Sequence, residues 1–174
     1  MPGMENIKLA FERNAKALTL KPSLGLGTGI SKTRIKNGLT CEIEEGNWKL
    51  LADMPASAGG GGQAPSPGVY GRAALGSCLA ITYMMYAAKM DIPIKMLEVE
   101  VQADYDDGAL LGTTDVTPGY SEVRYIITIE SEAAEKDILK MLDEADERSP
   151  YLDVFSQPQT CSRKINIISS KFNS

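Results

Sequence analysis

The feature that most constrains the fold is one long apolar helix, predicted from Pro67 to about Met90. Ser66 is a candidate N-cap and Pro67 suits the first helical position, so the helix has a clear start. Apolar residues then occupy nearly every face, which is typical of a helix surrounded by protein. Polar and small residues interrupt the run, so a buried core helix fits better than a membrane span of ~20 residues. In a chain of 174 residues, we expect a second subunit to supply part of the cover.

The chain contains no histidine, and this excludes several kinds of chemistry. Ser-His-Asp and Cys-His catalysis, histidine-ligated zinc and imidazole proton relays are ruled out. The net charge is −5, with 18 basic against 23 acidic residues, and the basic residues are scattered along the chain. Lys32, Arg34 and Lys36 form the nearest cluster, and their spacing of two fits the solvent-facing side of one strand. We therefore expect no nucleic-acid partner.

The cysteines and the N-terminus indicate the compartment. Cys41, Cys78 and Cys161 are odd in number and far apart, which argues against a disulfide framework. They also lack the short paired spacing of a thiolate metal site. The N-terminus has no cationic start followed by an apolar run, so it is not a secretory signal. We expect a cytoplasmic protein with reduced thiols, no metal, no cofactor and no membrane partner.

The elements before the long helix are a helix and a small meander. Residues 4–18 show the spacing of an amphipathic helix, and residues 30–36 and 39–44 read as strands joined at Asn37-Gly38, a strong hairpin signal. A third strand follows at 48–52. Residues 53–68 form a loop containing four consecutive glycines, Gly59 to Gly62. Two interpretations of this glycine run stay open: a flexible connector, or backbone packed closely against a site or a partner chain.

The elements after the long helix complete an α+β fold. Residues 97–105 alternate in polarity and predict a strand packed on one side, and residues 123–129 predict another. Residues 106–120 read as a loop or a wide hairpin. Residues 133–147 predict a helix with one polar face, ended by Ser149-Pro150, and residues 161–168 predict a last strand. Antiparallel hairpins mixed with helices in this order indicate the α+β class.

Cys78, on the long helix, is the residue whose chemistry matters most. Judged alone, a cysteine inside such a helix is most often an inert small apolar residue. It lies 12 residues after Ser66, about three turns in, where the helix dipole no longer activates a thiol. A reactive thiolate at this position would need a cation brought from another element.

The residues around Cys78 resemble a known family. Asp53-Met54-Pro55, the glycine run, Pro65-Ser66-Pro67 and the segment from Ala73 to Ala80 follow one another as in the OsmC-like proteins. That family includes osmotically inducible protein C and the organic hydroperoxide resistance proteins. The resemblance covers roughly residues 30–168. It implies an intertwined homodimer in which antiparallel sheets pack around long central helices, with active sites at the interface. We divide the chain into an N-terminal helical arm, 1–24, and an OsmC-like domain, 25–174.

The resemblance also implies a chemistry, in which a first cysteine attacks a peroxide and a second forms a disulfide with it. Cys78 matches the peroxidatic cysteine. Ser149 stands where the family's second cysteine precedes a proline, and Met54 stands where a glutamate is frequent. Arg34, on an N-terminal strand, is the candidate activator of the thiolate. The implied partners are a small-molecule peroxide and an external thiol reductant.

Three functions remain open from the sequence. The first is a redox protein that reduces (organic hydro)peroxides with a single cysteine. The second is a catalytically inactive protein that binds a small lipid-like molecule in an interfacial apolar pocket, with Cys78 in its lining. The third is a dimeric structural protein. Cys41 or Cys161 could replace the resolving thiol, although both are predicted on strands, where packing is the commoner role.

Overall fold

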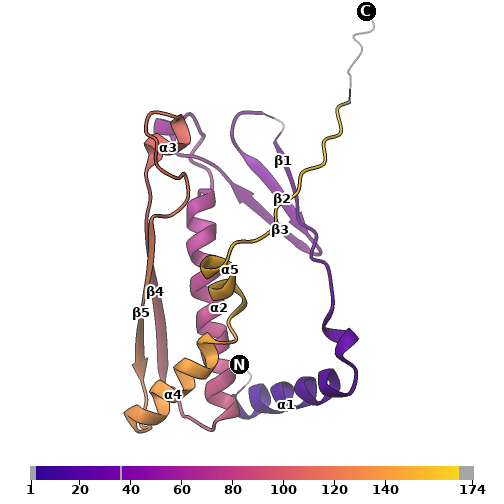
Figure 1. Cartoon of the computed structure of the whole chain (residues 1–174), viewed down its shortest axis with the longest axis vertical. Coiled ribbons are helices and arrows are strands. Elements are labelled where there is room, and N and C mark those ends of the chain that lie inside the picture. The colour runs from indigo at the N-terminus through magenta and orange to yellow at the C-terminus, as the bar shows by residue number, and fades with distance from the viewer. Residues whose placement is uncertain (1–2, 36, 169–174) are drawn as a thin grey trace, which may run out of the picture.

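Helix α2 (Pro67–Lys89) is the axis of the fold, and the other elements are arranged around it (Figure 1). This computed structural model describes residues 3–35 and 37–168. A two-stranded ribbon lies along one side of α2, and two short helices lie along another. Helix α1 (Met4–Leu20) crosses its C-terminal end, where the ring of Phe11 meets that of Tyr86 edge to face at 5.7 Å. No helix in the described ranges has the length and apolar character needed to cross a membrane.

The expected meander is present as an antiparallel sheet in the order β1-β2-β3. Its strands are β1 (Lys32–Ile35), β2 (Cys41–Glu45) and β3 (Trp48–Ala52), after a short 3-10 turn, η1 (Pro22–Gly25). Ile35 lies opposite Cys41, and these paired residues are six positions apart, whereas a two-residue Asn-Gly turn would leave three. Gly38 adopts φ +60°, the left-handed conformation that favours glycine. The predicted strand end at Lys36 lies outside the described residues.

The glycine-rich loop is held by one buried carboxylate. Asp53 is 2% exposed, and the loop after it includes a short 3-10 turn, η2 (Ala56–Ala58). The donors to its two oxygens are the backbone N–H groups of Met54, Gly61 and Gln63 and the hydroxyl of Thr40. The hydrogen bond from Gln63, with those from Met54 and Gly61, lowers the pKa of Asp53.

Close backbone packing explains one glycine of this loop. A Cβ atom on Gly60 would lie 1.9 Å from the carbonyl oxygen of Met54, so only glycine fits there without a shift of the backbone. Gly60 is closely packed, but against the backbone of its own loop and not against a site or a partner chain, so packing against either of those stays a prediction. The loop folds back on Asp53.

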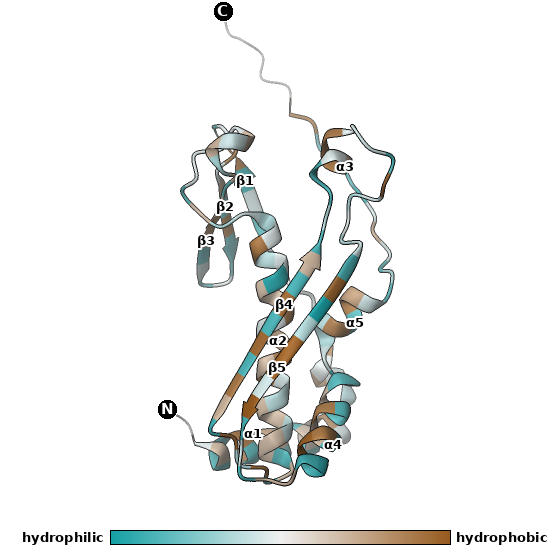
Figure 2. Ribbon diagram, turned by 90° about the vertical axis from the view of Figure 1, so that its left-hand side faces the viewer, coloured by the Kyte–Doolittle hydropathy of each residue, from teal (hydrophilic) through white to brown (hydrophobic). Residues whose placement is uncertain are grey.

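The second half of the chain covers α2 with a ribbon and two helices. Its elements are β4 (Met96–Asp104), α3 (Asp107–Leu111), β5 (Glu122–Glu130), α4 (Glu135–Asp146) and α5 (Pro150–Ser156). β4 and β5 are antiparallel, with Met96 opposite Glu130, and apolar and polar residues alternate along both strands (Figure 2). Gly76 lets α2 approach this ribbon, since a Cβ there would lie 3.3 Å from a methyl carbon of Val101.

The core follows one side of α2. Every fourth residue from Leu75 to Ala87 is buried, and Met141 and Ala145 of α4 pack on this stripe. The members of the α2 stripe are Leu75, Leu79, Tyr83 and Ala87. The opposite side carries an exposed stripe at the same spacing: Val69, Ala73, Ser77, Ile81 and Met85. Burial on all sides, as predicted for this helix, is thus not reached within one chain.

One sequence-based expectation for the C-terminal region was wrong, and one helix there was not predicted. Residues 161–168, predicted as a strand, have no regular structure and are exposed, because no described strand lies beside them to complete a ladder. Ser149-Pro150 does end the preceding helix, but it also begins α5, which the sequence did not predict. Pro150 takes the first helical position there, where its missing N–H has no cost.

Candidate active site

The predicted nucleophile, Cys78, lies next to Ser149 in the structure. The Sγ atom of Cys78 is 3.7 Å from the Oγ atom of Ser149, although 71 positions separate the two residues. Cys78 is half-buried between the core stripe and the exposed stripe of α2. In the sequence, only the family resemblance linked these two residues, because Ser149 stands where the family has its second cysteine. In the structure they lie in contact.

Ser149 occupies the junction between α4 and α5 and is 2% exposed. It is the N-cap residue of α5, yet its side chain makes no capping hydrogen bond. Both of its backbone groups are hydrogen-bonded. Its N–H donates to the carbonyl of Asp146 at 3.3 Å, and its carbonyl accepts from the backbone N–H of Asp153 at 3.1 Å. The hydroxyl is therefore directed at the sulfur of Cys78, the partner that the described residues provide for it.

A carboxylate on α4 fixes this junction from the other side. Asp146 accepts hydrogen bonds from the hydroxyls of Tyr83 on α2, at 2.6 Å, and Tyr125 on β5, at 3.0 Å. Burial raises the pKa of both tyrosines, and the bond to Asp146 raises them further, so both stay protonated donors at neutral pH. Because Asp146 lies three residues before Ser149, this clamp sets where the C-terminal end of α4 meets α2.

Arg34 is not part of this pair within one chain. It lies on β1 with its side chain exposed, and its guanidinium is 3.5 Å from the carboxylate of Glu44. It makes no hydrogen bond or ion pair with Cys78 across the described ranges. Met54, which stands where the family often has a glutamate, donates its backbone N–H to the carboxylate of Asp53 at 2.8 Å. Among the described residues of one chain, no cation forms a hydrogen bond or ion pair with Cys78.

The other two cysteines lie in different surroundings. Cys41 is half-buried on β2, opposite Ile35 and Ala52, whereas Cys161 is exposed in the segment after α5. All three cysteines fall within the described residues, and none is in a disulfide. Across the same residues, no group of three Cys, Asp or Glu side chains is arranged to hold a metal ion.

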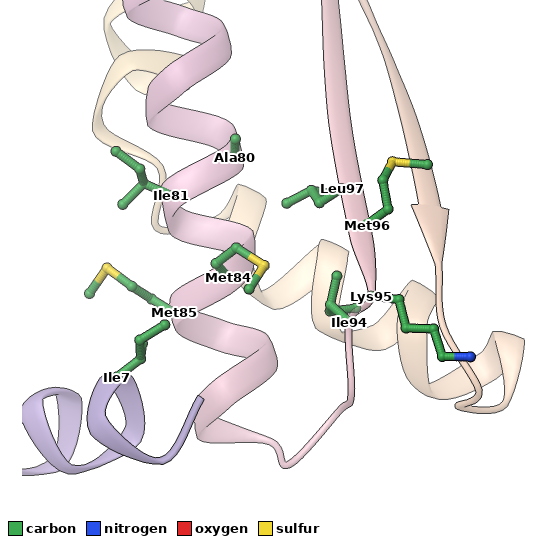
Figure 3. Close-up of a pocket in the computed structure, with 9 residues that line it drawn as sticks. All are labelled: Ile7, Ala80, Ile81, Met84, Met85, Ile94, Lys95, Met96 and Leu97. Carbon is green, nitrogen blue, oxygen red and sulfur yellow. The ribbon is translucent and has the colours of Figure 1, made fainter. Parts of the chain in front are cut away.

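A separate apolar pocket lies lower on α2, where α1 and the start of β4 approach it (Figure 3). Its volume is about 500 Å³. The lining residues are Ile7, Ala80, Ile81, Met84, Met85, Ile94, Lys95, Met96 and Leu97. The ammonium of Lys95 pairs with Glu132 at 2.7 Å, so the pocket presents mainly aliphatic and thioether surface. Cys78 is not in the lining of this pocket, so it is a different site from the interfacial pocket that the sequence suggested as an alternative.

Sequence reasoning missed the two carboxylate centres, Asp53 and Asp146. Asp53 precedes a loop rich in glycine, a composition in which free N–H groups need an acceptor, and this signal could have identified it. The clamp at Asp146 had no comparable signal, since its tyrosines lie 63 and 21 positions away. Only the packed fold brings those side chains together.

We next compared the chain with known protein families and solved structures. A family model described as OsmC-like protein matches residues 60–162, which is more than half of the chain. No curated protein matches.

Solved structures show the same fold. An OsmC-like protein from Mycoplasma pneumoniae superposes with a TM-score of 0.65 at 17% identity, covering 75% of this chain and 88% of that one. A putative osmotic stress induced and detoxification response protein from Psychrobacter arcticus gives 0.59 at 24% identity, covering 74% and 89%. An organic hydroperoxide resistance protein OsmC from Legionella pneumophila gives 0.54 at 20% identity, covering 75% and 90%.

Proposed function

The chain belongs to the OsmC-like family, and from that premise we propose that it is a redox protein that reduces hydroperoxides with Cys78. A structural neighbour is an organic hydroperoxide resistance protein, which supports a role in peroxide stress. The contact between Cys78 and Ser149 is the observation that carries the proposal, because it joins the two positions where the family pattern places its chemistry.

The reaction begins with the Cys78 thiolate, the nucleophilic form of the residue. The sulfur attacks the terminal oxygen of the hydroperoxide, the O–O bond breaks, and the leaving alkoxide takes a proton to become an alcohol. Sulfur has then lost two electrons and carries OH as a sulfenic acid. An external thiol displaces this OH as water and forms a mixed disulfide. A second thiol attacks the mixed disulfide, releases Cys78 and leaves the reductant as its own disulfide.

The resolving step is external because Ser149 replaces a thiol with a hydroxyl. A hydroxyl cannot form a disulfide, so the neighbour of Cys78 cannot complete the cycle. Cys41 lies on β2, and Cys161 lies in the exposed segment after α5, and neither contacts Cys78. The free thiols support a reducing compartment, and we place the protein in the cytoplasm.

We further propose that the working unit is a homodimer. The exposed stripe on α2 contains Ile81, which is 61% exposed, and has the i, i+4 spacing of a ridge that packs against another helix. No described element covers Trp48 and Leu50 of the β1-β2-β3 sheet, and both side chains are exposed. Arg34 makes no contact with Cys78 within one chain, so its role as thiolate activator requires an approach across the subunit interface.

Peroxide consumption tests the proposal directly. Organic hydroperoxide loss is measured with a panel of monothiols and dithiols, comparing the native protein with Cys78→Ser and with Cys41→Ser as a matched control. We expect Cys78→Ser to abolish turnover and Cys41→Ser to retain it. Turnover that survives in Cys78→Ser, or an inactive native protein with every reductant, would overturn the proposal.

The apolar pocket of about 500 Å³ favours a second candidate, the binding of a lipid-like molecule. Its size falls within the range of small-molecule sites, and its lining is mainly apolar. Fluorescent fatty-acid analogues should then bind to the native protein and to Cys78→Ser alike. Ala80→Trp, which fills the pocket, should weaken that binding at least tenfold, and unchanged binding would exclude this site.

A further inference from the structure

The buried hydroxyl of Ser149 lies beside Cys78, and its position indicates more than the loss of a resolving thiol. Ser149 sits at a helix N-cap, where a serine hydroxyl ordinarily accepts a hydrogen bond from a backbone N–H of the first turn. Here it makes no such bond, and it is 2% exposed. A hydroxyl turned away from its usual partner and shielded from water is directed at one atom, the sulfur of Cys78.

The direction of the hydrogen bond depends on the state of that sulfur. A neutral thiol is a weak donor and a weak acceptor, so it gains little from the hydroxyl. A thiolate has no proton to donate, and the Ser149 hydroxyl then becomes the donor to a full negative charge. Hydrogen bonds to a charged partner are roughly twice as strong as neutral ones, so the contact favours the thiolate over the thiol.

We propose that Ser149 is a catalytic residue whose O–H group donates to the Cys78 thiolate and raises its population. This inference rests on the proposed function of Cys78 and adds a reason for a hydroxyl at this position. No bond is made or broken in this step, because the serine keeps its proton. The donor compensates in part for the cation that the described part of one chain does not bring to Cys78.

The clamp at Asp146 makes the hydroxyl an effective donor. The carboxylate is tied to Tyr83 on the helix that bears Cys78 and to Tyr125 on β5. The backbone N–H of Ser149 donates to the carbonyl of the same Asp146. The position of the hydroxyl is therefore fixed before the thiolate forms, and a donor already in place needs no reorganisation when the charge develops.

Alkylation at pH 7 tests this inference without peroxide. The rate at Cys78 with iodoacetamide is followed by peptide mapping, with the exposed Cys161 as the internal reference in each sample. We expect Ser149→Ala to slow alkylation of Cys78 about tenfold, the effect of one charge-assisted hydrogen bond. Ser149→Thr, which keeps a hydroxyl, should restore the rate to within about threefold of the native protein. Ser156→Ala, at the other end of α5, should leave it unchanged.

Each outcome decides the inference. A rate in Ser149→Ala within twofold of the native rate would overturn it. Equal slowing in Ser149→Thr and Ser149→Ala would also overturn it, because packing and not the hydroxyl would be the cause. If Ser149→Ala does not fold, a slow rate in folded Ser149→Thr overturns the inference and a native-like rate supports it. A hydroxyl-dependent rate in a protein that does not consume peroxide would refute the proposed function, and with it the catalytic role of Ser149, while the hydrogen bond to the Cys78 thiolate would stand.

Discussion

Replacing Ser149 by cysteine should create the disulfide that this chain lacks. The Sγ atom of Cys78 is 3.7 Å from the oxygen that the new sulfur would replace. A disulfide has an S–S length of ~2.05 Å, so the two atoms must approach by about 1.7 Å. The clamp at Asp146 holds the backbone of residue 149, so rotation of the two cysteine side chains about their Cα–Cβ bonds must supply this movement.

The size of the effect follows from the loop that the bond closes. Cys78 and Ser149 are 71 positions apart. In the chain-entropy account, closing a loop of that length stabilises the protein by about 4 kcal/mol, before any native-state strain is subtracted. For a chain of this size, such a gain raises the melting temperature by roughly 8–16 °C. The oxidised variant should therefore melt well above its own reduced form.

The assay treats Ser149→Cys with one equivalent of an organic hydroperoxide, followed by non-reducing peptide mapping and calorimetry with and without dithiothreitol. Ser156→Cys is the matched control, since its thiol lies at the far end of α5 and should form no bond to Cys78. The native protein should stop at sulfenic acid and over-oxidise with excess peroxide. If Cys78 is oxidised in Ser149→Cys but no cross-link to position 149 is found, the pairing of these two positions is refuted.

Four further variants test the other parts of the structure. Asp53→Asn should lower the melting temperature, because the glycine-rich loop loses its charged acceptor. The pKa of Asp53 is lowered in the fold, so its contribution is present above the unfolded-state pKa of ~3.9 and is lost as pH falls through the lower folded-state pKa. Calorimetry between about pH 5 and 2 should therefore show less proton uptake on unfolding of the variant than of the native protein. Tyr83→Phe should reduce the free energy of unfolding by about 2 kcal/mol in urea, since a buried hydrogen bond to a carboxylate is lost; an unchanged midpoint would contradict the clamp. Ile81→Asp should convert a dimer to a monomer in light scattering, and a native protein that is already monomeric would disprove the dimer. Arg34→Met should slow the reaction with peroxide about tenfold, as expected for ~1.4 kcal/mol of lost charge interaction, and Lys32→Met should not; equal effects in both would remove Arg34 from the mechanism.

The elements were predictable where the signal is local. Alternation of polarity placed β4 within one residue at each end, and Ser66-Pro67 marked the start of α2 correctly. Residues 161–168, also predicted as a strand, form none, because the sequence of a segment does not determine whether a neighbouring strand is present to pair with it. In the proposed homodimer, a strand of the second copy could pair with residues 161–168, and this stays a prediction.

The site was predictable only in part, for a related reason. Cys78 and Ser149 could be paired through the family pattern, which carries information about the fold that neither residue holds by itself. Tyr83 looks in the sequence like one more member of an apolar stripe, and Asp146 like one more acid on a polar helix. Their meeting depends on how α2, α4 and β5 pack, and sequence spacing does not determine that.

The clamp at Asp146 has a consequence for how the protein opens. One half-buried carboxylate accepts from α2 and from β5 while it belongs to α4, so pulling any one of these elements away breaks a hydrogen bond to a charged partner. The penalty for partial opening is therefore shared by all three, and separating them becomes a single event. Amide hydrogen exchange should show common protection for these elements under mild denaturant, while the β1-β2-β3 sheet exchanges earlier and on its own.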